Sequence, residues 1–234
     1  MNSSDVAIIS PIKFLSDYCN TTRLQLCYTD IAIKNPEYVN FYCEKVKSGN
    51  IVILDSSPRI PRSPISEVFT NEIIKKINPT YVVLPDVDFS WEKTCLLIEE
   101  YREVSTVKTI GVLQGVDEKS IKMCYKEIKD YCDVIGLPVS NEKVMNRNDI
   151  IRKLKIDKPC IFLGVYKNPI EEIPVCNNII GLCTDLPVRL GIDLRKLFEY
   201  YPEPPVLDFY LDEIPLPELV SSNIMNYLDL VQGG

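Results

Sequence analysis

Eight short runs of apolar and β-branched residues alternate with amphipathic segments, and this order limits the fold more than any other feature of the sequence. Runs of this length and composition are typical of buried strands. They lie at residues 6–10, 24–32, 50–56, 80–86, 109–115, 133–138, 160–164 and 179–185. The segments between them predict helices, several of which begin with Ser, Asp or Asn followed by Pro or an acidic residue, as capped helices do. These helices are expected at 35–49, 63–79, 90–106, 117–131 and 146–156.

The repeated strand-then-helix order predicts parallel strands, and eight such units predict an α/β fold of the (β/α)8 TIM-barrel type. An open, doubly wound sheet is the alternative, but no GxGxxG follows the first strand. The 234 residues suit a single domain over 1–234. We expect the barrel at about 5–201, and a C-terminal extension with a closing helix at 202–234.

The amino-acid composition argues against histidine-dependent catalysis, zinc sites and disulfide frameworks. The chain contains no His, so proton transfer has to come from Asp, Glu, Cys, Tyr or Lys. Its nine Cys form no CxxC or CxC pair, which indicates neither a zinc site nor a disulfide framework. We therefore expect no metal and no cofactor.

Charge and hydropathy restrict the partners. A net charge of −7 argues against a general nucleic-acid coat protein, although it allows a local basic patch. No apolar run approaches the length of a membrane span, and the N-terminal residues lack the pattern of a signal peptide. We expect a cytoplasmic protein without membrane contact. The Lys-, Ile- and Asn-rich composition fits an AT-rich genome, and a viral protein would act in the host cytoplasm.

Polar residues recur where the predicted strands end, which in a barrel is the active-site face. A single residue of this kind is better explained by a turn or a helix cap, but Asp55, Asp86 and Gln114 together indicate a site. Carboxylate and amide groups suit the edge of a purine, and glycine lets a flat ring approach the backbone. A guanine-like base fits this set. The residues at the strand ends are Asp30, Asp55, Ser56, Asp86, Gln114, Gly115, Gly136, Cys183, Thr184 and Asp185.

Five stretches resemble, in the same order, the motifs of the tRNA-guanine transglycosylases and of their relatives that place 7-deazaguanine bases in DNA. Each falls on the expected strand, and together they cover about residues 50–190. The stretches are LDSSPRI (54–60), VLPDVDF (83–89), GVLQG (111–115), DVIGLPV (133–139) and FLGV (162–165).

The resemblance implies a (β/α)8 barrel that binds guanine or a 7-deazaguanine and exchanges one for the other in nucleic acid. Asp55 would be the acid/base carboxylate and Ser56 a polar contact near the base. The remaining implied base-binding residues are Asp86 and Gln114 at the base edge, with Gly115, Gly136, Leu137, Leu163 and Gly164 around the ring.

The predicted eighth strand departs from the family pattern. There, an Asp attacks the anomeric carbon of the sugar, but alignment on Pro187 to Arg189 puts Cys183 at that place. The nearest carboxylate is Asp185, which is either on the same strand face or in a turn before Pro187. Asp185 as nucleophile, Cys183 as nucleophile, and no covalent step at all remain as alternatives.

The family's zinc subdomain has no counterpart here, so the chain is more similar to short DNA-modifying, phage-type members. DNA is therefore the favoured polymer over tRNA, and either a homodimer or a partner-subunit role is left open. Arg59, Arg62 and Arg189 are candidate phosphate contacts, because Arg binds phosphate with paired hydrogen bonds; solvated Arg in a Pro-rich loop is the alternative for the first two. A hydrolytic N-glycosidase and a non-catalytic binder of a guanine-like base or nucleotide are the competing functions.

Overall fold

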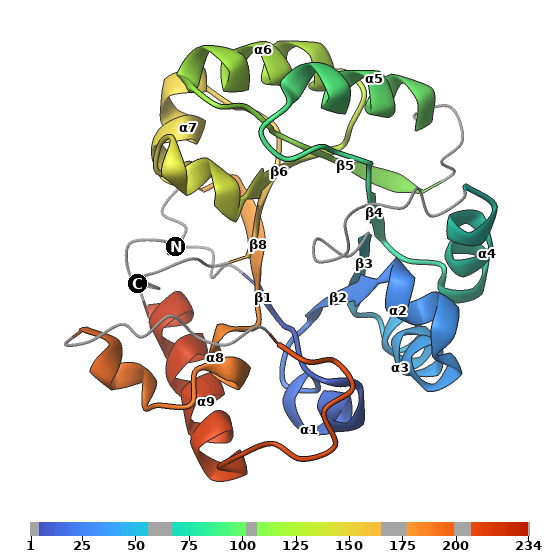
Figure 1. Cartoon of the computed structure of the whole chain (residues 1–234), viewed down its shortest axis with the longest axis vertical. Helices are drawn as coiled ribbons and strands as arrows, with labels where there is room; N and C mark the ends of the chain where they lie inside the picture. Colours follow the sequence, from blue (N-terminus) through green and yellow to red (C-terminus); the bar gives the residue numbers. More distant parts are fainter. Residues whose placement is uncertain (1–4, 56–66, 102–106, 165–176, 199–206, 234) are drawn as a thin grey trace. The chain divides into compact units, whose positions relative to one another are not determined.

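A computed structural model describes residues 5–55, 67–101, 107–164, 177–198 and 207–233 (Figure 1). All eight predicted strands are present in the described part of the chain. They are β1 (Asp5–Ile8), β2 (Leu24–Tyr28), β3 (Ile51–Asp55), β4 (Tyr81–Val83), β5 (Lys108–Val112), β6 (Val134–Pro138), β7 (Cys160–Leu163) and β8 (Ile179–Thr184). They form one sheet in the order β1-β8-β7-β6-β5-β4-β3-β2. The chain therefore has the (β/α)8 TIM-barrel fold that the sequence predicts.

Helices follow the strands along the described chain, and the five predicted after the second to sixth strands are confirmed. The α-helices are α1 (Leu15–Tyr18), α2 (Thr29–Lys34), α3 (Pro36–Lys47), α4 (Glu67–Ile77), α5 (Trp91–Tyr101), α6 (Glu118–Ile128), α7 (Arg147–Leu154), α8 (Leu186–Arg189) and α9 (Pro217–Gly233). Three short 3₁₀ helices accompany them: η1 (Ile12–Phe14), η2 (Val139–Lys143) and η3 (Leu194–Phe198). None of the helices in the described part of the chain is long and apolar enough to span a bilayer.

Residues 24–136 make up one compact unit. Its strands pair in parallel, with Tyr28 opposite Asp55 in β2 and β3, and Val112 opposite Gly136 in β5 and β6. The strand interiors are fully buried, as Ile53, Leu54, Ile110 and Ile135 illustrate. In Figure 1, α3 lies beside α4 and α5 lies beside α6, and both pairs are in contact.

Helix starts in this unit follow directly from the sequence. The Asn35 side chain accepts a hydrogen bond from the Tyr38 N–H (2.9 Å), and Pro36 takes the first position of α3. Asp117 begins α6 with a capping box, in which its Oδ1 accepts from the Ser120 N–H (2.7 Å). These caps set the point at which each loop after a strand becomes a helix.

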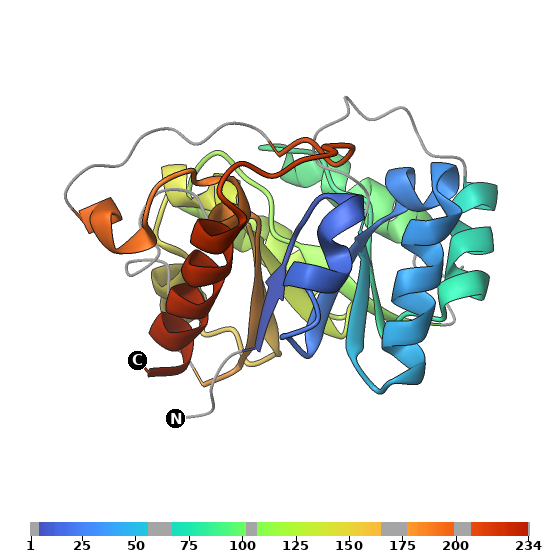
Figure 2. The ribbon, with the colours of Figure 1, turned by 90° about the horizontal axis from the view of Figure 1, so that it is seen from below.

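Residues 1–23 and 137–234 make up the second compact unit. Within it, β8 lies between β1 and β7, with Cys183 opposite both Ala7 and Leu163. The closing helix predicted from the sequence is α9, which runs alongside β1 (Figure 2) and also packs against α8 and η3. Buried apolar residues of α9, such as Val220, Ile224 and Tyr227, supply the contact.

One predicted strand end is displaced in the structure. The second apolar run was expected to continue to residue 32, but β2 ends at Tyr28 and the chain turns directly into α2. Asp30 therefore lies in the first turn of a helix rather than at a strand end. An acidic residue in a first helical turn is favoured by the helix dipole, which accounts for its place.

Candidate functional site

Asp86 and Gln114 come together just beyond the ends of β4 and β5. The Gln114 Nε2 donates to Asp86 Oδ2 at 2.6 Å and lies 3.4 Å from Asp88 Oδ1. Asp86 is 6% exposed and Gln114 is 1% exposed. The structure thus places two of the predicted base-edge residues in direct contact, in a setting with little access to water.

The backbone of Phe89 fixes the orientation of the Gln114 amide. Its N–H donates to Gln114 Oε1 at 3.1 Å, so the amide nitrogen is the atom that faces the carboxylates. Phe89 adopts a left-handed backbone conformation, with φ of 60°, and its ring is 40% exposed. Non-glycine residues in this conformation carry strain and cluster at functional sites, where surrounding contacts hold them.

The loop that carries Asp86, Asp88 and Phe89 is tied to α5. The Val87 N–H donates to Thr94 Oγ1 at 2.9 Å, and the Ser90 N–H donates to the Val87 carbonyl at 3.0 Å. Thr94 is fully buried. A rigid helix therefore positions both carboxylates.

Gly115 is explained by helix packing. A Cβ at this position would lie 2.6 Å from Ser120 Oγ and 2.7 Å from the Ile121 backbone nitrogen, so only glycine lets α6 begin this close to the end of β5. The Val116 N–H also donates to Ser120 Oγ at 3.0 Å. A contact between Gly115 and a base remains a prediction.

Three further residues of the predicted site follow β3. Asp55 is the last residue of that strand and is half-buried, so the expected acid/base carboxylate does lie at a strand end. Ser56, together with Arg59 and Arg62, lies outside the described residues.

A buried arginine joins the ends of β6 and β7. Arg147, the first residue of α7, donates through Nη1 to the carbonyls of Leu137 (3.3 Å) and Gly164 (2.8 Å). Its Nε donates to Glu142 Oε1 at 3.0 Å, and its guanidinium lies 4.4 Å from the centre of the Phe162 ring. Arg147 is fully buried, and it stabilises the two strand ends through charge-assisted hydrogen bonds.

The sequence analysis missed Arg147, because its helix has the polar composition of a solvated one. Leu137 and Leu163 lie near the carboxyl ends of β6 and β7, and Gly164 follows β7; a contact of these residues with a base remains a prediction. Gly164 has a φ of 83°, the left-handed region, which explains the glycine where the chain leaves β7. The Gly136 carbonyl accepts from the Leu113 N–H at 2.9 Å.

At the end of β8 the two candidate nucleophiles have different surroundings. Cys183 lies within the strand and is fully buried. Asp185 follows the strand as the residue before α8, and its Oδ1 accepts from Arg189 Nε at 2.7 Å. Both side chains of this ion pair are mostly buried. Asp185 therefore lies in the turn before Pro187, which is the second of the two placements expected from the sequence. Arg189, a candidate phosphate contact, forms an ion pair with this carboxylate.

Within the described residues, no group of three or more His, Cys, Asp or Glu side chains is placed to hold a metal ion. Eight cysteines of the described chain are free thiols, and the buried ones include Cys124, next to Gln114. The Cys124 Sγ accepts from the Gln114 N–H at 3.5 Å.

Comparison with known proteins supports the fold alone. No protein-family model matches the sequence, and no curated protein matches it significantly. Among solved structures, the YdjI aldolase of Escherichia coli K12 is similar over 99% of this chain and 89% of its own, with 9% identity and a TM-score of 0.53. N-acetylneuraminate lyase of Mycoplasma synoviae matches over 84% of this chain and 72% of its own, with 11% identity and a TM-score of 0.51.

A racemase of Streptomyces coelicolor A3(2), solved with bound magnesium, is similar over 79% of this chain, with 9% identity and a TM-score of 0.50. The match spans 57% of the racemase chain. At such identities these proteins share an architecture, and one barrel hosts many chemistries. The class of protein defined here is therefore the (β/α)8 barrel.

Proposed function

We propose that the protein is a guanine transglycosylase, which binds guanine at Asp86 and Gln114 and exchanges it for a 7-deazaguanine-type base in nucleic acid, DNA rather than tRNA. The observation that carries the proposal is the buried contact between Asp86 and Gln114, ordered by the Phe89 N–H. The order of the five sequence stretches that resemble the transglycosylases supports the same conclusion.

The polar groups at this site complement the edge of guanine. Guanine presents two N–H groups, which a carboxylate accepts, and beside them a carbonyl, which an amide N–H₂ donates to. An ionised carboxylate offers about four acceptor positions, so Asp86 can accept from more than one donor at a time. Adenine presents a different donor and acceptor pattern, and a buried polar site rejects a ligand that leaves its groups unpaired.

Phe89 adds an apolar surface beside these polar groups. Its half-exposed ring follows Asp88 directly, and its backbone contacts the Gln114 amide. Nucleobases that leave their stack are commonly bound by stacking on an aromatic side chain. In the proposal, the Phe89 ring takes this role while Asp86 and Gln114 bind the edge.

The chemical steps rest on the sequence resemblance. The Asp185 carboxylate attacks the anomeric carbon, the bond to guanine breaks, and a covalent sugar intermediate forms. The incoming base then attacks the same carbon and releases Asp185. Asp55 gives a proton to the departing base and takes one from the incoming base, which balances the exchange. A carboxylate suits this reaction better than Cys183, because it stabilises the positive charge that develops on the sugar.

A second candidate function is favoured by the ion pair at Asp185. A carboxylate bound by Arg189 at 2.7 Å is a weaker nucleophile than one in an uncharged setting. The competing proposal is a protein that binds a guanine-like base without breaking a glycosidic bond, alone or as the partner of a catalytic subunit.

An exchange assay separates the two functions. The protein is incubated with radiolabelled guanine and either DNA or tRNA, and polymer is separated from free base under denaturing conditions. We expect label in DNA, loss of both binding and exchange in Asp86→Ala, and at least about a 1,000-fold loss of exchange with intact binding in Asp185→Asn. The matched control is Asp212→Asn, whose side chain is 91% exposed and which should exchange normally.

Three results would count against the proposal in different ways. Guanine binding without label in either polymer favours the non-catalytic protein. Release of free guanine from the polymer without incorporation identifies a hydrolase. Exchange by Asp185→Asn at the wild-type rate shows that Asp185 is not the nucleophile.

A further inference from the structure

The ion pair between Asp185 and Arg189 joins two groups that the proposed reaction needs separately, the nucleophile and a candidate phosphate contact. It lies at the carboxyl end of β8, and strand ends of this kind carry the active sites of the fold. Arg189 Nε donates to Asp185 Oδ1 at 2.7 Å, and only 15% of the arginine and 13% of the aspartate side chain are exposed. Because little water screens the two charges, this pair is stronger than one on an open surface.

The backbone around this ion pair is fixed by hydrogen bonds. The Ile9 N–H donates to the Thr184 carbonyl at 2.8 Å, and Thr184 Oγ1 accepts from the Leu186 N–H at 3.0 Å. The Arg189 N–H donates to the Asp185 carbonyl at 3.2 Å. A change of partner here is therefore a change in two side chains, and the strand end keeps its place.

A phosphodiester matches the group that Arg189 binds in this pair. Carboxylate and phosphodiester are both singly charged anions with two equivalent oxygens, and a guanidinium binds either with charge-assisted, often paired hydrogen bonds. Transfer of Arg189 to a phosphodiester leaves the guanidinium neutralised, so only the carboxylate of Asp185 loses a partner. In the proposed reaction, positive charge develops on the sugar and takes the place of the guanidinium beside that carboxylate.

We propose that Arg189 passes from Asp185 to a backbone phosphate of the bound strand, so that nucleic acid itself releases the nucleophile. Without DNA, the ion pair lowers the reactivity of the carboxylate; with DNA, the carboxylate faces the sugar. The catalytic consequence rests on the proposed function, whereas the competition of Asp185 and phosphate for Arg189 does not. The same competition reconciles the ion pair with a nucleophilic Asp185.

DNA binding tests the competition without any need for catalysis. The probe is a fluorescein-labelled single strand of thymidines around one deoxyguanosine, and fluorescence anisotropy gives its affinity at several salt concentrations. We expect Asp185→Asn to tighten binding by about tenfold, because Arg189 no longer has to leave a carboxylate. Arg189→Gln should weaken binding and reduce the salt slope by about 0.7, the value for one phosphate of a single strand. In the Arg189→Gln background, Asp185→Asn should change the affinity by less than about twofold.

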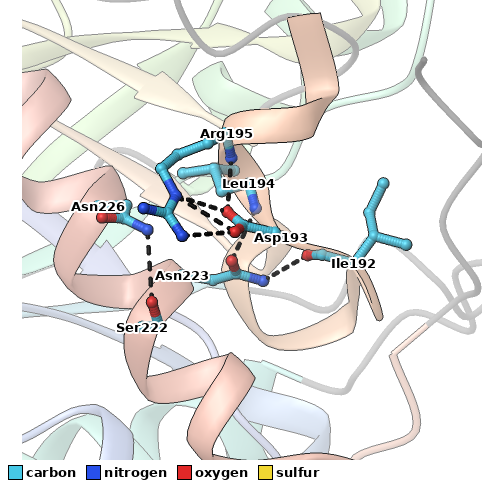
Figure 3. A network of polar contacts seen from close by, with 7 residues as sticks. All are labelled: Ile192, Asp193, Leu194, Arg195, Ser222, Asn223 and Asn226. Carbon is cyan, nitrogen blue, oxygen red and sulfur yellow. Dashed lines mark hydrogen bonds and ion pairs between the residues drawn. The ribbon is translucent and has the colours of Figure 1, made fainter. Parts of the chain in front are cut away.

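Asp193→Asn is the matched control. Asp193 pairs with Arg195 at 2.6 Å just before the end of the chain turns into η3 (Figure 3), so its replacement removes the same charge and also releases an arginine. Since η3 packs against α9 and follows no strand directly, and salt screens distant charges, the affinity for DNA should change by less than about twofold. Asp185→Ser and Arg189→Met are second variants at the two positions, should thermal unfolding show that the first ones do not fold.

Three binding results would overturn the proposal. Equal tightening by Asp185→Asn with and without Arg189 would mean that the loss of a negative charge explains the effect. Unchanged affinity in Asp185→Asn would mean that the carboxylate does not compete with phosphate. Absence of DNA binding in both the wild type and Asp185→Asn would mean that Arg189 does not receive a phosphate.

Exchange of guanine in deoxyguanosine, which has no phosphate, tests the catalytic consequence. We expect Arg189→Gln to incorporate labelled guanine into deoxyguanosine at least about tenfold faster than the wild type does, and into DNA more slowly. A fall with both substrates would show that Arg189 orients Asp185, and it would overturn the proposed release. Absence of exchange in every variant would reject the transglycosylase, and the binding measurements would still decide the competition for Arg189.

Discussion

At the residue scale, the site depends on side chains whose partners restrict them to one orientation. Gln114 is the clearest case, because its oxygen is bonded to the Phe89 N–H and its nitrogen to Asp86. Such pre-ordered polar groups bind a complementary ligand with little loss of side-chain conformational entropy. The pairing of Asp86 with Gln114 was foreseeable from the sequence, because both follow apolar strands and the carboxyl ends of neighbouring strands lie together.

Replacement of Gly115 by alanine tests how closely α6 approaches β5. The added Cβ would meet the Ile121 backbone nitrogen at 2.7 Å, and backbone cannot rotate away as a side chain can. We expect Gly115→Ala to lower the free energy of unfolding by about 1–3 kcal/mol, the usual cost of overpacking. Urea denaturation measures this loss, and the exposed neighbour in Val116→Ala should change stability by less than about 0.5 kcal/mol. Equal stability of Gly115→Ala and the wild type would show that α6 moves freely.

The burial of Arg147 could not be predicted from the sequence. Arg is almost never fully buried without partners, so the polar composition of α7 is typical of a solvated helix. The burial of this side chain depends on carbonyls from two strand ends and on Glu142, none of which lies next to it in the sequence. The periodicity of a sequence describes one helix or strand at a time, so it does not show that groups from several elements surround the same side chain.

At the scale of elements, caps and side-chain bridges decide where helices begin and what they pack against. Figure 3 shows the bridge at α9: Asn223 donates through Nδ2 to the Ile192 carbonyl and accepts from the Leu194 N–H, both at 2.8 Å. The helix itself was predicted from the sequence, as the closing helix of the C-terminal extension. This attachment to the segment after α8 was not, since an Asn in a helix carries no signal of its tertiary partner.

Asn223→Leu should weaken the attachment of α9. The substitution leaves the buried Leu194 N–H and the half-buried Ile192 carbonyl without this partner, and an unsatisfied buried group costs about 1–3 kcal/mol. We expect the free energy of unfolding to fall by about 2–4 kcal/mol in denaturant titrations. Asn226→Leu, which lies one turn further along and removes a long contact to Ser222 at 3.5 Å, is the control and should be nearly neutral. A similar loss in both variants would mean that helix propensity, not the bridge, determines stability.

The capping box of α6 makes part of the stability depend on pH. Hydrogen bonds from the Ser120 backbone and side chain lower the pKa of Asp117 below its ordinary value. Because the folded state lowers this pKa, the contribution is fully present above the pKa of the unfolded chain, near 4, and is lost as pH falls through the folded value. We expect Asp117→Asn to flatten the stability profile below about pH 4, as measured by thermal unfolding.

The control for that measurement is Asp130→Asn, which removes the same charge from the same region and leaves the capping box of α6 intact. An unchanged profile in Asp117→Asn would indicate that the Asp117 carboxylate does not cap α6 in solution.

At the scale of the whole molecule, the alternation of strands and helices was enough to predict the fold. Eight apolar runs became eight parallel strands because each is short, rich in β-branched residues and followed by an amphipathic segment. The function is not encoded at this scale, since aldolase, lyase and racemase structures share the architecture at 9–11% identity. What distinguishes this chain is the chemistry of a few residues at the strand ends.

The central claim is that Asp86 and Gln114 form a site for guanine, and calorimetric titration tests it most directly. Guanine and adenine would each be titrated into the wild type and into Asp86→Asn. We predict that the wild type binds guanine and discriminates against adenine by at least about 100-fold, and that Asp86→Asn loses guanine binding by a similar factor. Absence of guanine binding to the wild type, or equal binding of both bases, would contradict the account.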